Sequence, residues 1–445
     1  MTVVPTIKLF IFALILGLFQ THAIQNVAVI GAGAAGLASA KHALDYGYNV
    51  TIYEKSEKLG GVWYYTEKTG NNSFGVPVHS PNYQGLRTNV PYQIMEYPDF
   101  HYPPGTKSYP TAKEVWNYLD SYAREFKLSG LIKLNHLVEN VIPLENGSWR
   151  VYAKAYPTKT LVSKVFDAVL VCTNLYSYPY TPDIDGINDF KLKKIHSHDY
   201  RKAADFRGKE VLIIGGGPSG VDIAQLISKT AKRVMLSTNT DILLSDDVRQ
   251  KLYGKNSTFK PVVRRLTSNG ADFEDGTSQT FNAVIFATGY RYKFPFLKNA
   301  GIKTDDNLVY PLFNQILNVN YPTMALIGIP YLASFYSFSM EARFALKFIS
   351  GELKMPTKDE MNFNFNEFIG HLRANNIPKS KSHFLGTYTK IYYDYIAMVA
   401  KIETIPSYYG GVYADAIQSF HTDPIGFRNY KYIIDGDSFD KVKEK

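Results

Sequence analysis

The sequence predicts an α/β fold built from two similar units, and three observations support this. A short apolar run at 27–30 leads into the turn 31–36, which reads GAGAAG, and then into a helix-forming run. The same order returns at 210–214 and 215–220, where the turn reads GGGPSG. A third apolar run, within 284–290, ends in a small-residue turn. Parallel strands joined by helices are the expected result, as in Rossmann-like dinucleotide-binding domains.

In the first unit, each glycine of the turn has its own physical role. Gly31 permits a tight turn, Gly33 lets the backbone approach a pyrophosphate, and Gly36 lets the helix pack on the strand. The helix N-terminus offers unpaired N–H groups and a positive dipole to phosphates. The next expected strand, 49–53, ends on Glu54, whose carboxylate can accept hydrogen bonds from ribose hydroxyls. This complete order predicts a dinucleotide site.

The second unit differs from the first at a position that bears on the cofactor. Its second strand, 233–236, is followed by Ser-Thr-Asn at 237–239 and by no acid. An acid there binds a free ribose 2′-hydroxyl and repels a 2′-phosphate, so its absence favours NADPH over NADH. Lys232 and Arg233 lie nearby, but the sequence does not tell where their side chains point. We therefore predict FAD on the first unit and NADPH on the second.

The two units predict a larger FAD domain with a smaller NADPH domain inserted into it. Residues 24–190 form the first part of the FAD domain and residues 191–297 form the NADPH domain. Residues 298–445 complete the FAD domain and add a C-terminal region. The strand and turn at 284–290 resemble the ATG motif at which flavoprotein chains cross back between nucleotide domains, and this resemblance implies the same crossing here.

The first 23 residues have the pattern of a secretory signal peptide. Lys8 is followed by an apolar run at 9–19, which is too short to span a bilayer, and then by Thr-His-Ala at 21–23. We therefore expect a secreted, extracellular protein whose mature chain begins at Ile24 or Gln25. An N-terminal membrane anchor is the alternative. No other run approaches about 20 apolar residues, so no stable membrane span is expected.

Charge and cysteine content exclude several classes of function. The net charge of the 445-residue chain is +9, but its basic residues are scattered, so nucleic acid is not an expected partner. Cys172 is the only cysteine, which excludes an internal disulfide, a redox cysteine pair and a cysteine-rich metal site. His196 and His198 lack a surrounding ligand set, so no metal is expected. Assembly into a homo-oligomer is left open.

N-glycosylation sequons begin at Asn49, Asn71, Asn146 and Asn256. Asn49 enters the strand of the first nucleotide unit, so we expect it to be buried. Asn146 is better placed, because residues 145–148 are typical of a hairpin turn between strands at 137–144 and 149–155. This predicts a glycoprotein with Asn146 as the most accessible site.

Four further motifs, with the two nucleotide turns, resemble the flavin-containing monooxygenases over nearly the whole mature chain. They are the loop 60–63 (GGVW), the pair 88–89 (TN), the segment 190–200 (FKLKKIHSHDY) and the segment 322–330 (PTMALIGIP). A family member with a signal peptide and no membrane anchor resembles the insect branch of that family. This branch includes secreted enzymes that N-oxygenate pyrrolizidine alkaloids. The chain departs from the family pattern at Asn174, Leu175, Leu192 and Asn239.

The resemblance implies which residues hold the cofactors. FAD contacts fall on Gly31, Ala32, Gly33, Ala34, Ala35, Gly36, Glu54, Gly61, Val62, Trp63, Thr88 and Asn89. NADPH contacts fall on Gly215, Gly216, Gly217, Pro218, Ser219, Gly220 and Asp222. Asn89 is also the candidate catalytic residue, because its uncharged amide can donate and accept hydrogen bonds beside the flavin.

The activity implied is that of an NADPH- and O2-dependent monooxygenase acting through a C4a-hydroperoxyflavin. Its substrate would be a small molecule with a tertiary amine nitrogen or a sulfide sulfur, and N-oxide formation on pyrrolizidine alkaloids would serve detoxification. Three alternatives stand beside this: a broad-specificity N- and S-oxygenating enzyme of other xenobiotics, an amine oxidase, and a secreted flavoprotein carrier without turnover. The second nucleotide turn argues against the oxidase, which needs no nicotinamide site.

Overall fold

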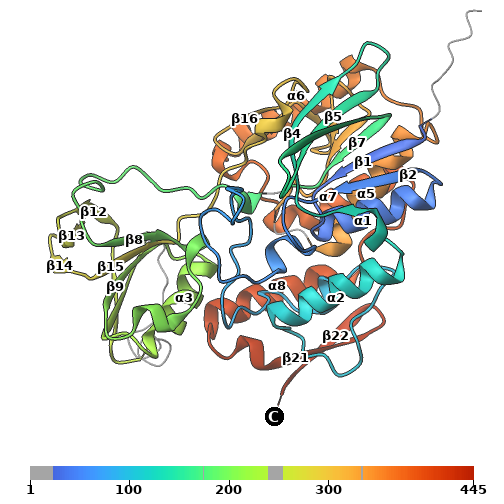
Figure 1. The fold of residues 1–445 in the computed structure, drawn as a ribbon. Helices are drawn as coiled ribbons and strands as arrows, with labels where there is room; N and C mark the ends of the chain where they lie inside the picture. The colour runs from blue at the N-terminus through green and yellow to red at the C-terminus, as the bar shows by residue number, and fades with distance from the viewer. Residues whose placement is uncertain (1–23, 174, 239–253, 332–333, 445) are drawn as a thin grey trace, which may run out of the picture.

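The computed structural model describes residues 24–173, 175–238, 254–331 and 334–444, which form a large and a small lobe (Figure 1). The predicted signal peptide lies outside the described residues, as do the family departures at Asn174 and Asn239. None of the helices in the described ranges is long and apolar enough to cross a bilayer.

The large lobe is built on a seven-stranded sheet that draws its strands from both halves of the chain. The order is β18-β19-β20-β7-β1-β2-β3, and the strands from β20 to β3 are parallel. Their bounds are Asn26–Ile30 (β1), Asn49–Tyr53 (β2), Ile132–Lys133 (β3), Ala168–Val171 (β7), Leu312–Phe313 (β18), Leu317–Asn318 (β19) and Met324–Leu326 (β20). The predicted strand–turn–helix–strand order of the first unit is therefore present.

Two layers cover this sheet, and β1 contributes to both. Val27 and Val29 pack under the helices α1 (Ala34–Asp45), α2 (Ala112–Glu125) and α5 (Phe335–Ile349). Ala28 and Ile30 face the antiparallel sheet β4–β5–β6 (His136–Pro143, Trp149–Ala155 and Thr160–Phe166). Side chains alternate between the faces of a strand, so a strand buried on both faces is apolar throughout.

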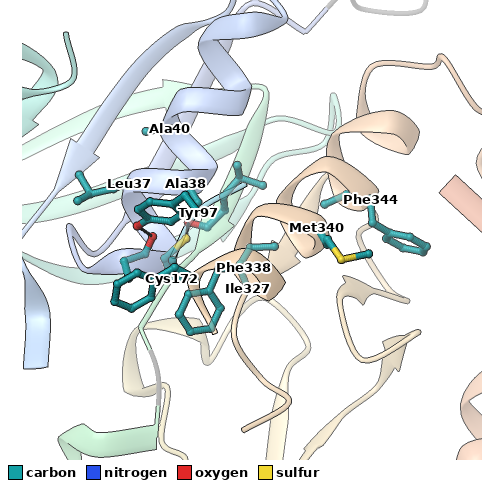
Figure 2. Packing of buried hydrophobic residues seen from close by; sticks show 14 of the residues in the cluster. Leu37, Ala38, Ala40, Tyr97, Cys172, Ile327, Phe338, Met340 and Phe344 are labelled. Carbon is teal, nitrogen blue, oxygen red and sulfur yellow. Dashed lines mark hydrogen bonds between the residues drawn. The ribbon is translucent and has the colours of Figure 1, made fainter. Parts of the chain in front are cut away.

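The helices α1 and α5 meet through small and aromatic side chains in the core of the large lobe. Figure 2 shows Leu37 and Ala38 from α1 gathered with Phe338 and Met340 from α5. Cys172 lies in the same cluster, 3.3 Å from Ser39 Oγ, and burial raises the pKa of its thiol to about 12. This cysteine is therefore a neutral core residue and not a reactive thiolate.

The small lobe repeats the plan of the large one. Its five parallel strands have the order β11-β10-β9-β15-β8, with α3 (Pro218–Ser228) on one face. Their bounds are Lys193–His196 (β8), Glu210–Ile214 (β9), Arg233–Ser237 (β10), Ser257–Lys260 (β11) and Ala283–Phe286 (β15). The other face carries the antiparallel strands Val263–Leu266 (β12), Gly270–Phe273 (β13) and Ser278–Thr280 (β14). Ile184 and Phe190 also pack in this lobe, although the predicted boundary at 190/191 assigns them to the first part.

The chain enters and leaves the small lobe through two segments that lie side by side. Tyr180 N donates to Gly289 O at 2.9 Å, and Arg291 N donates to Tyr178 O at 2.8 Å. The returning segment follows β15 directly, where the sequence predicted the crossing. The C-terminal part then adds α6 (Lys358–Ala374), α7 (Thr389–Ala400), α8 (Tyr408–Thr422) and the hairpins β16–β17 (Lys303–Asp305, Leu308–Tyr310) and β21–β22 (Tyr430–Asp435, Ser438–Lys443).

One expectation from the sequence, the burial of Asn49, is wrong. The run 165–171 is divided between β6 and β7. Asp167 separates the strands and holds the start of β1, because its Oδ2 accepts from the backbone N–H groups of Gln25 and Asn26 at 2.9 and 2.8 Å. Asn49 is exposed and not buried, because it begins β2 at the outer end of the strand. The turn that contains Asn146 follows β4 as expected, and the side chain of Asn146 is exposed.

Glu341 is a fully buried acid that joins three segments of the large lobe. Its Oε2 accepts from Gly328 N at 2.6 Å, and its Oε1 accepts from the Tyr393 hydroxyl of α7 at 2.9 Å. Burial raises the pKa of the Glu341 carboxyl from 4.5 to about 8, and these two hydrogen bonds only partly oppose that shift. The folded protein therefore keeps a proton that the unfolded chain releases between these two values.

Because the folded state binds more protons, this carboxyl should make the protein less stable as the pH rises from about 5 to 8. Glu341→Gln keeps a neutral side chain of the same shape, so it should flatten that pH dependence and be the more stable protein at pH 8. Denaturant unfolding of both proteins at pH 5, 6, 7 and 8 measures the difference. Parallel stability curves for the two proteins would contradict this origin of the pH dependence.

Candidate functional site

The first glycine turn places the N-terminus of α1 at the carboxyl end of β1. Gly31 has φ +107°, which favours glycine, and a Cβ on Gly36 would lie 1.8 Å from Gly31 O. No side chain of the described residues caps α1, and its first turn contains no acid. The free N–H groups of Ala34, Ala35 and Gly36 thus remain available to an anion.

Glu54 is held in place by the same turn. Its Oε2 accepts from Ala32 N and its Oε1 accepts from Ser56 N, both at 2.8 Å, and the residue is 5% exposed. Each carboxylate oxygen has a second lone pair, so a ribose hydroxyl can still donate to it. The carboxylate is therefore oriented before any ligand binds.

The loop Gly61–Val62–Trp63 lies against the first glycine turn. Gly60 N donates to Ala32 O at 2.9 Å, and the Cα of Gly33 is 3.2 Å from where a Cβ on Gly61 would sit. The backbones of the two loops thus approach more closely than a side chain at Gly61 would allow. Trp63 packs edge-on against Phe335 at 6.4 Å and stays half-buried.

The second glycine turn has the same geometry at the end of β9. A Cβ on Gly220 would lie 1.9 Å from Gly215 O, whereas a Cβ on Gly217 would meet nothing within 4 Å. Gly217 is the N-cap of α3 and Pro218 is its first residue, a position that needs no N–H. Gly216 and Ser219 complete this partly exposed turn, whose free N–H groups suit a second pyrophosphate.

The basic residues near the second turn do not all face it. Lys232 and Arg233 both pair with Glu210 at 2.8 Å, at the amino-terminal edge of the small-lobe sheet. Ligands bind at the opposite, carboxyl-terminal edge of such sheets, so these two cations cannot contact a 2′-phosphate there. Lys260 ends β11 at that edge, beside Ser237, and pairs with Asp275 at 2.7 Å. The sequence did not single out Lys260, because β11 was not predicted.

Thr88 and Asn89 lie where the two lobes meet, and Arg428 joins them. Arg428 follows α8 and donates from Nε to Thr88 O at 3.0 Å and from Nη2 to Asn89 Oδ1 at 2.6 Å. The Thr88 hydroxyl is buried without a hydrogen-bond partner in the described structure. Arg428 was missed in the sequence, because no motif surrounds it.

Asp222 has partners from the large lobe. Its Oδ1 accepts from Arg428 Nη1 at 2.8 Å, and its Oδ2 accepts from the Tyr83 hydroxyl at 2.7 Å. Tyr83 in turn packs edge-on against Tyr200 at 5.4 Å. The carboxylate of Asp222 thus ties α3 to the segment that leads to Asn89, and its contact with a nicotinamide cofactor stays a prediction.

Two histidines at the junction of the lobes, His79 and His196, are kept neutral by burial. Burial, with the positive charge of Lys55, lowers the pKa of His79 to about 3. Burial, with His198 beside it, lowers the pKa of His196 to about 4. His198 lies between His79 O at 3.1 Å and Asp199 at 3.0 Å. Near neutral pH, His79 and His196 therefore add no positive charge to the junction.

The remaining residues of the 190–200 motif are structural. Phe190 and Tyr200 are buried in the two hydrophobic clusters of the small lobe. Leu192, which departs from the family pattern, is 43% exposed. This departure therefore lies on the surface and away from the glycine turns.

A comparison of the sequence with models of protein families shows which family contains these glycine turns. The model of flavin-binding monooxygenase-like proteins matches residues 24–243 and 239–424. The chain belongs to the flavin-binding monooxygenase-like family. The resemblance inferred from the motifs is thereby confirmed.

Individual relatives agree with this assignment. Senecionine N-oxygenase of Tyria jacobaeae is 33% identical over 432 residues, which cover 96% of this chain and 94% of that protein. Flavin-containing monooxygenase FMO GS-OX-like 6 of Arabidopsis thaliana is 35% identical over 379 residues, covering 81% of this chain and 80% of the relative. The structure of S-allyl-L-cysteine S-oxygenase from Allium sativum has a TM-score of 0.86 at 30% identity, and the match covers 92% of this chain and 95% of the other.

The chain is therefore an NADPH-dependent flavin monooxygenase with FAD and NADPH as cofactors. The expected α/β fold with two Rossmann-like units is also confirmed. The residues fit the cofactors, because each lobe offers an uncapped helix N-terminus behind a glycine turn, and the large lobe adds the preset Glu54 carboxylate. The individual contact residues remain predictions.

A substitution in the second glycine turn can change nucleotide binding without changing the stability of the fold. Gly217→Ala should leave stability unchanged, because its methyl group meets no atom of the protein, but it should weaken NADP+ binding by about tenfold or more by blocking a phosphate. Calorimetric titration with NADP+ and thermal unfolding measure the two effects.

The matched controls for this variant are two other glycines. Gly130→Ala, at an exposed position with open space, should alter neither property. Gly220→Ala should lower stability as well as binding, because its methyl group would overlap Gly215 O. Unchanged NADP+ affinity in Gly217→Ala would place the phosphate elsewhere.

Proposed function

We propose that this monooxygenase N-oxygenates tertiary amine alkaloids of the pyrrolizidine type, which detoxifies them. The observation that carries the proposal is the similarity to senecionine N-oxygenase along 96% of the chain. The overall reaction converts a tertiary amine, O2, NADPH and a proton into the N-oxide, NADP+ and water. Only the unprotonated nitrogen, with its lone pair, can accept the oxygen atom.

In this proposal the protein binds and orients, and bound FAD supplies the redox centre at which NADPH and O2 react. The α1 and α3 N-termini hold the two pyrophosphates, and Glu54 holds a ribose. Asn89 offers an amide N–H near the flavin. Neutral His79 and His196 add no charge to the lobe junction. The ring of Tyr290 packs edge-on against His196 at 5.2 Å, and such packing would help to keep water out once the cofactors are bound.

A second candidate function is S-oxygenation of small sulfides. It is supported by the S-allyl-L-cysteine S-oxygenase structure, whose fold matches with a TM-score of 0.86. A sulfide sulfur offers a lone pair to the same oxygen donor as an amine nitrogen does. The two candidates differ only in which substrate is turned over faster.

The test is turnover of matched substrates by the FAD-loaded protein. NADPH added without air should bleach the flavin, and admission of air with senecionine should yield one N-oxide per NADPH consumed. The N-methyl quaternary salt of senecionine has no nitrogen lone pair and is the matched inactive control. Faster turnover of S-allyl-L-cysteine than of senecionine would favour S-oxygenation. A flavin that NADPH does not bleach would favour the carrier without turnover.

We also propose that the protein is secreted and carries a glycan on Asn146. The basic Lys8, the apolar run 9–19 and the small residues at 21–23 support entry into the secretory pathway. The exposed turn after β4 supports glycan attachment.

Expression of the full chain in insect cells tests this proposal. The medium should contain protein that begins at Ile24 or Gln25, and Asn146→Gln should lower its mass by one glycan. Leu16→Arg, which interrupts the apolar run, should keep the protein inside the cells. Full-length protein that sediments with membranes would instead indicate an N-terminal anchor.

A further inference from the structure

Arg428 makes one ion pair and two hydrogen bonds that converge on the predicted active site. Its Nε donates to Thr88 O at 3.0 Å, its Nη2 to Asn89 Oδ1 at 2.6 Å, and its Nη1 to Asp222 Oδ1 at 2.8 Å. Its side chain is 11% exposed and that of Asp222 is 9% exposed. All three nitrogens of one guanidinium are thus used, across two lobes.

The guanidinium decides which way the Asn89 amide faces. Arginine has only donors, so the atom of Asn89 that faces it must be the amide oxygen. The amide Nδ2, with two N–H groups, therefore points away from Arg428. It has no hydrogen-bond partner among the residues that the structure describes. Asn89 consequently presents a donor, and not an acceptor, to whatever occupies the site.

The same guanidinium links Asn89 to the small lobe. Asp222 lies on α3, one turn beyond the second glycine turn, and its other oxygen accepts from Tyr83 of the large-lobe chain. Gly85 follows at close range, because a Cβ there would lie 3.2 Å from the Leu226 side chain of α3. Phe420 of α8 also packs against the small-lobe core. Segments before and after Asn89 in the chain are thus docked on one helix.

We infer that Arg428 is a positioning residue that fixes the Asn89 amide as a donor only while α3 is docked on the large lobe. If α3 moved away, Arg428 would lose the carboxylate of Asp222 and become exposed to water, so one of the three contacts that hold the plane of its guanidinium against Asn89 would be lost. The docked state of the NADPH-binding helix and the orientation of Asn89 are therefore coupled. The inference rests on the proposed role of Asn89 beside the flavin.

Lysine cannot replace arginine in this role. A lysine ammonium is a single point charge, so it can pair with Asp222 but cannot also hold the Asn89 oxygen and Thr88 O in a planar fork. Arg428→Lys therefore separates the two functions of the residue. It should retain the docking of α3 and lose the control of the amide.

The test compares Arg428→Lys, Arg428→Ala and Asp222→Asn in the FAD-loaded enzyme. Arg428→Lys should bind NADP+ within about twofold of the unchanged protein but should release several-fold more hydrogen peroxide per NADPH. Arg428→Ala should release the same excess of hydrogen peroxide per NADPH and bind NADP+ about tenfold more weakly. Asp222→Asn should weaken NADP+ binding and release less hydrogen peroxide than Arg428→Ala. Calorimetry gives the affinities without turnover, and product and peroxide per NADPH give the coupling.

Two further variants make the result specific. Arg265→Ala removes an exposed arginine that pairs with Asp189 at 3.3 Å, so it should change neither quantity. Asn89→Ala should release as much hydrogen peroxide per NADPH as Arg428→Ala does. The double variant, with both substitutions, should release no more than either single variant, because both changes act on the same oriented donor.

Several outcomes would overturn the inference. Arg428 would not act through Asn89 if Arg428→Lys formed one product per NADPH, or if the excess hydrogen peroxide of the two single variants added up in the double variant. A lower melting temperature with unchanged coupling would make Arg428 only a structural residue. If Arg428→Ala fails to fold, Asp222→Asn and Arg428→Lys still carry the test. If the unchanged protein itself yields no N-oxide or sulfoxide, the proposed function fails, and the affinities still test the docking.

Discussion

The close approach of a helix N-terminus to the end of a strand is the constraint on which both nucleotide sites depend. Gly36 and Gly220 each stand where a single methyl carbon would lie under 2 Å from the carbonyl oxygen of the first glycine in the turn. Only a residue without a side chain lets the helix dipole meet the ligand there. The two lobes satisfy the constraint in the same way, which is why two separate sheets present similar edges to the region between them.

Around this repeated core, the sequence predicted what local pattern controls and missed what distant contacts control. The first two strands of each unit, both glycine turns and Glu54 follow from periodicity and motif spacing within a few dozen residues, whereas β11 was not predicted. Arg428 reaches Asn89 across 339 positions of the chain, so no local pattern could reveal it. The side chains of Lys232 and Arg233 could be assigned to an edge of the sheet only after their common partner Glu210 was known.

Electrostatics at the lobe junction follow from burial more than from net charge. The chain carries a net charge of +9, yet burial keeps His79 and His196 neutral. The charged groups at this junction are placed in defined pairs, above all Arg428 with Asp222. A junction whose charges are paired and whose amide and backbone donors are oriented suits a reaction whose electrons and oxygen come from cofactor and gas, because unpaired charges would attract water.

The strand order of the large lobe also has a consequence for how the protein is made. β7 (Ala168–Val171) is buried on both faces, and its outer neighbour β20 (Met324–Leu326) emerges from the ribosome only after the entire small-lobe sheet. The inserted lobe can therefore complete its sheet during synthesis, while the nascent large lobe still exposes an unpaired apolar edge. The rate at which residues 172–326 are translated thus sets how long that edge is open to chaperones or to aggregation.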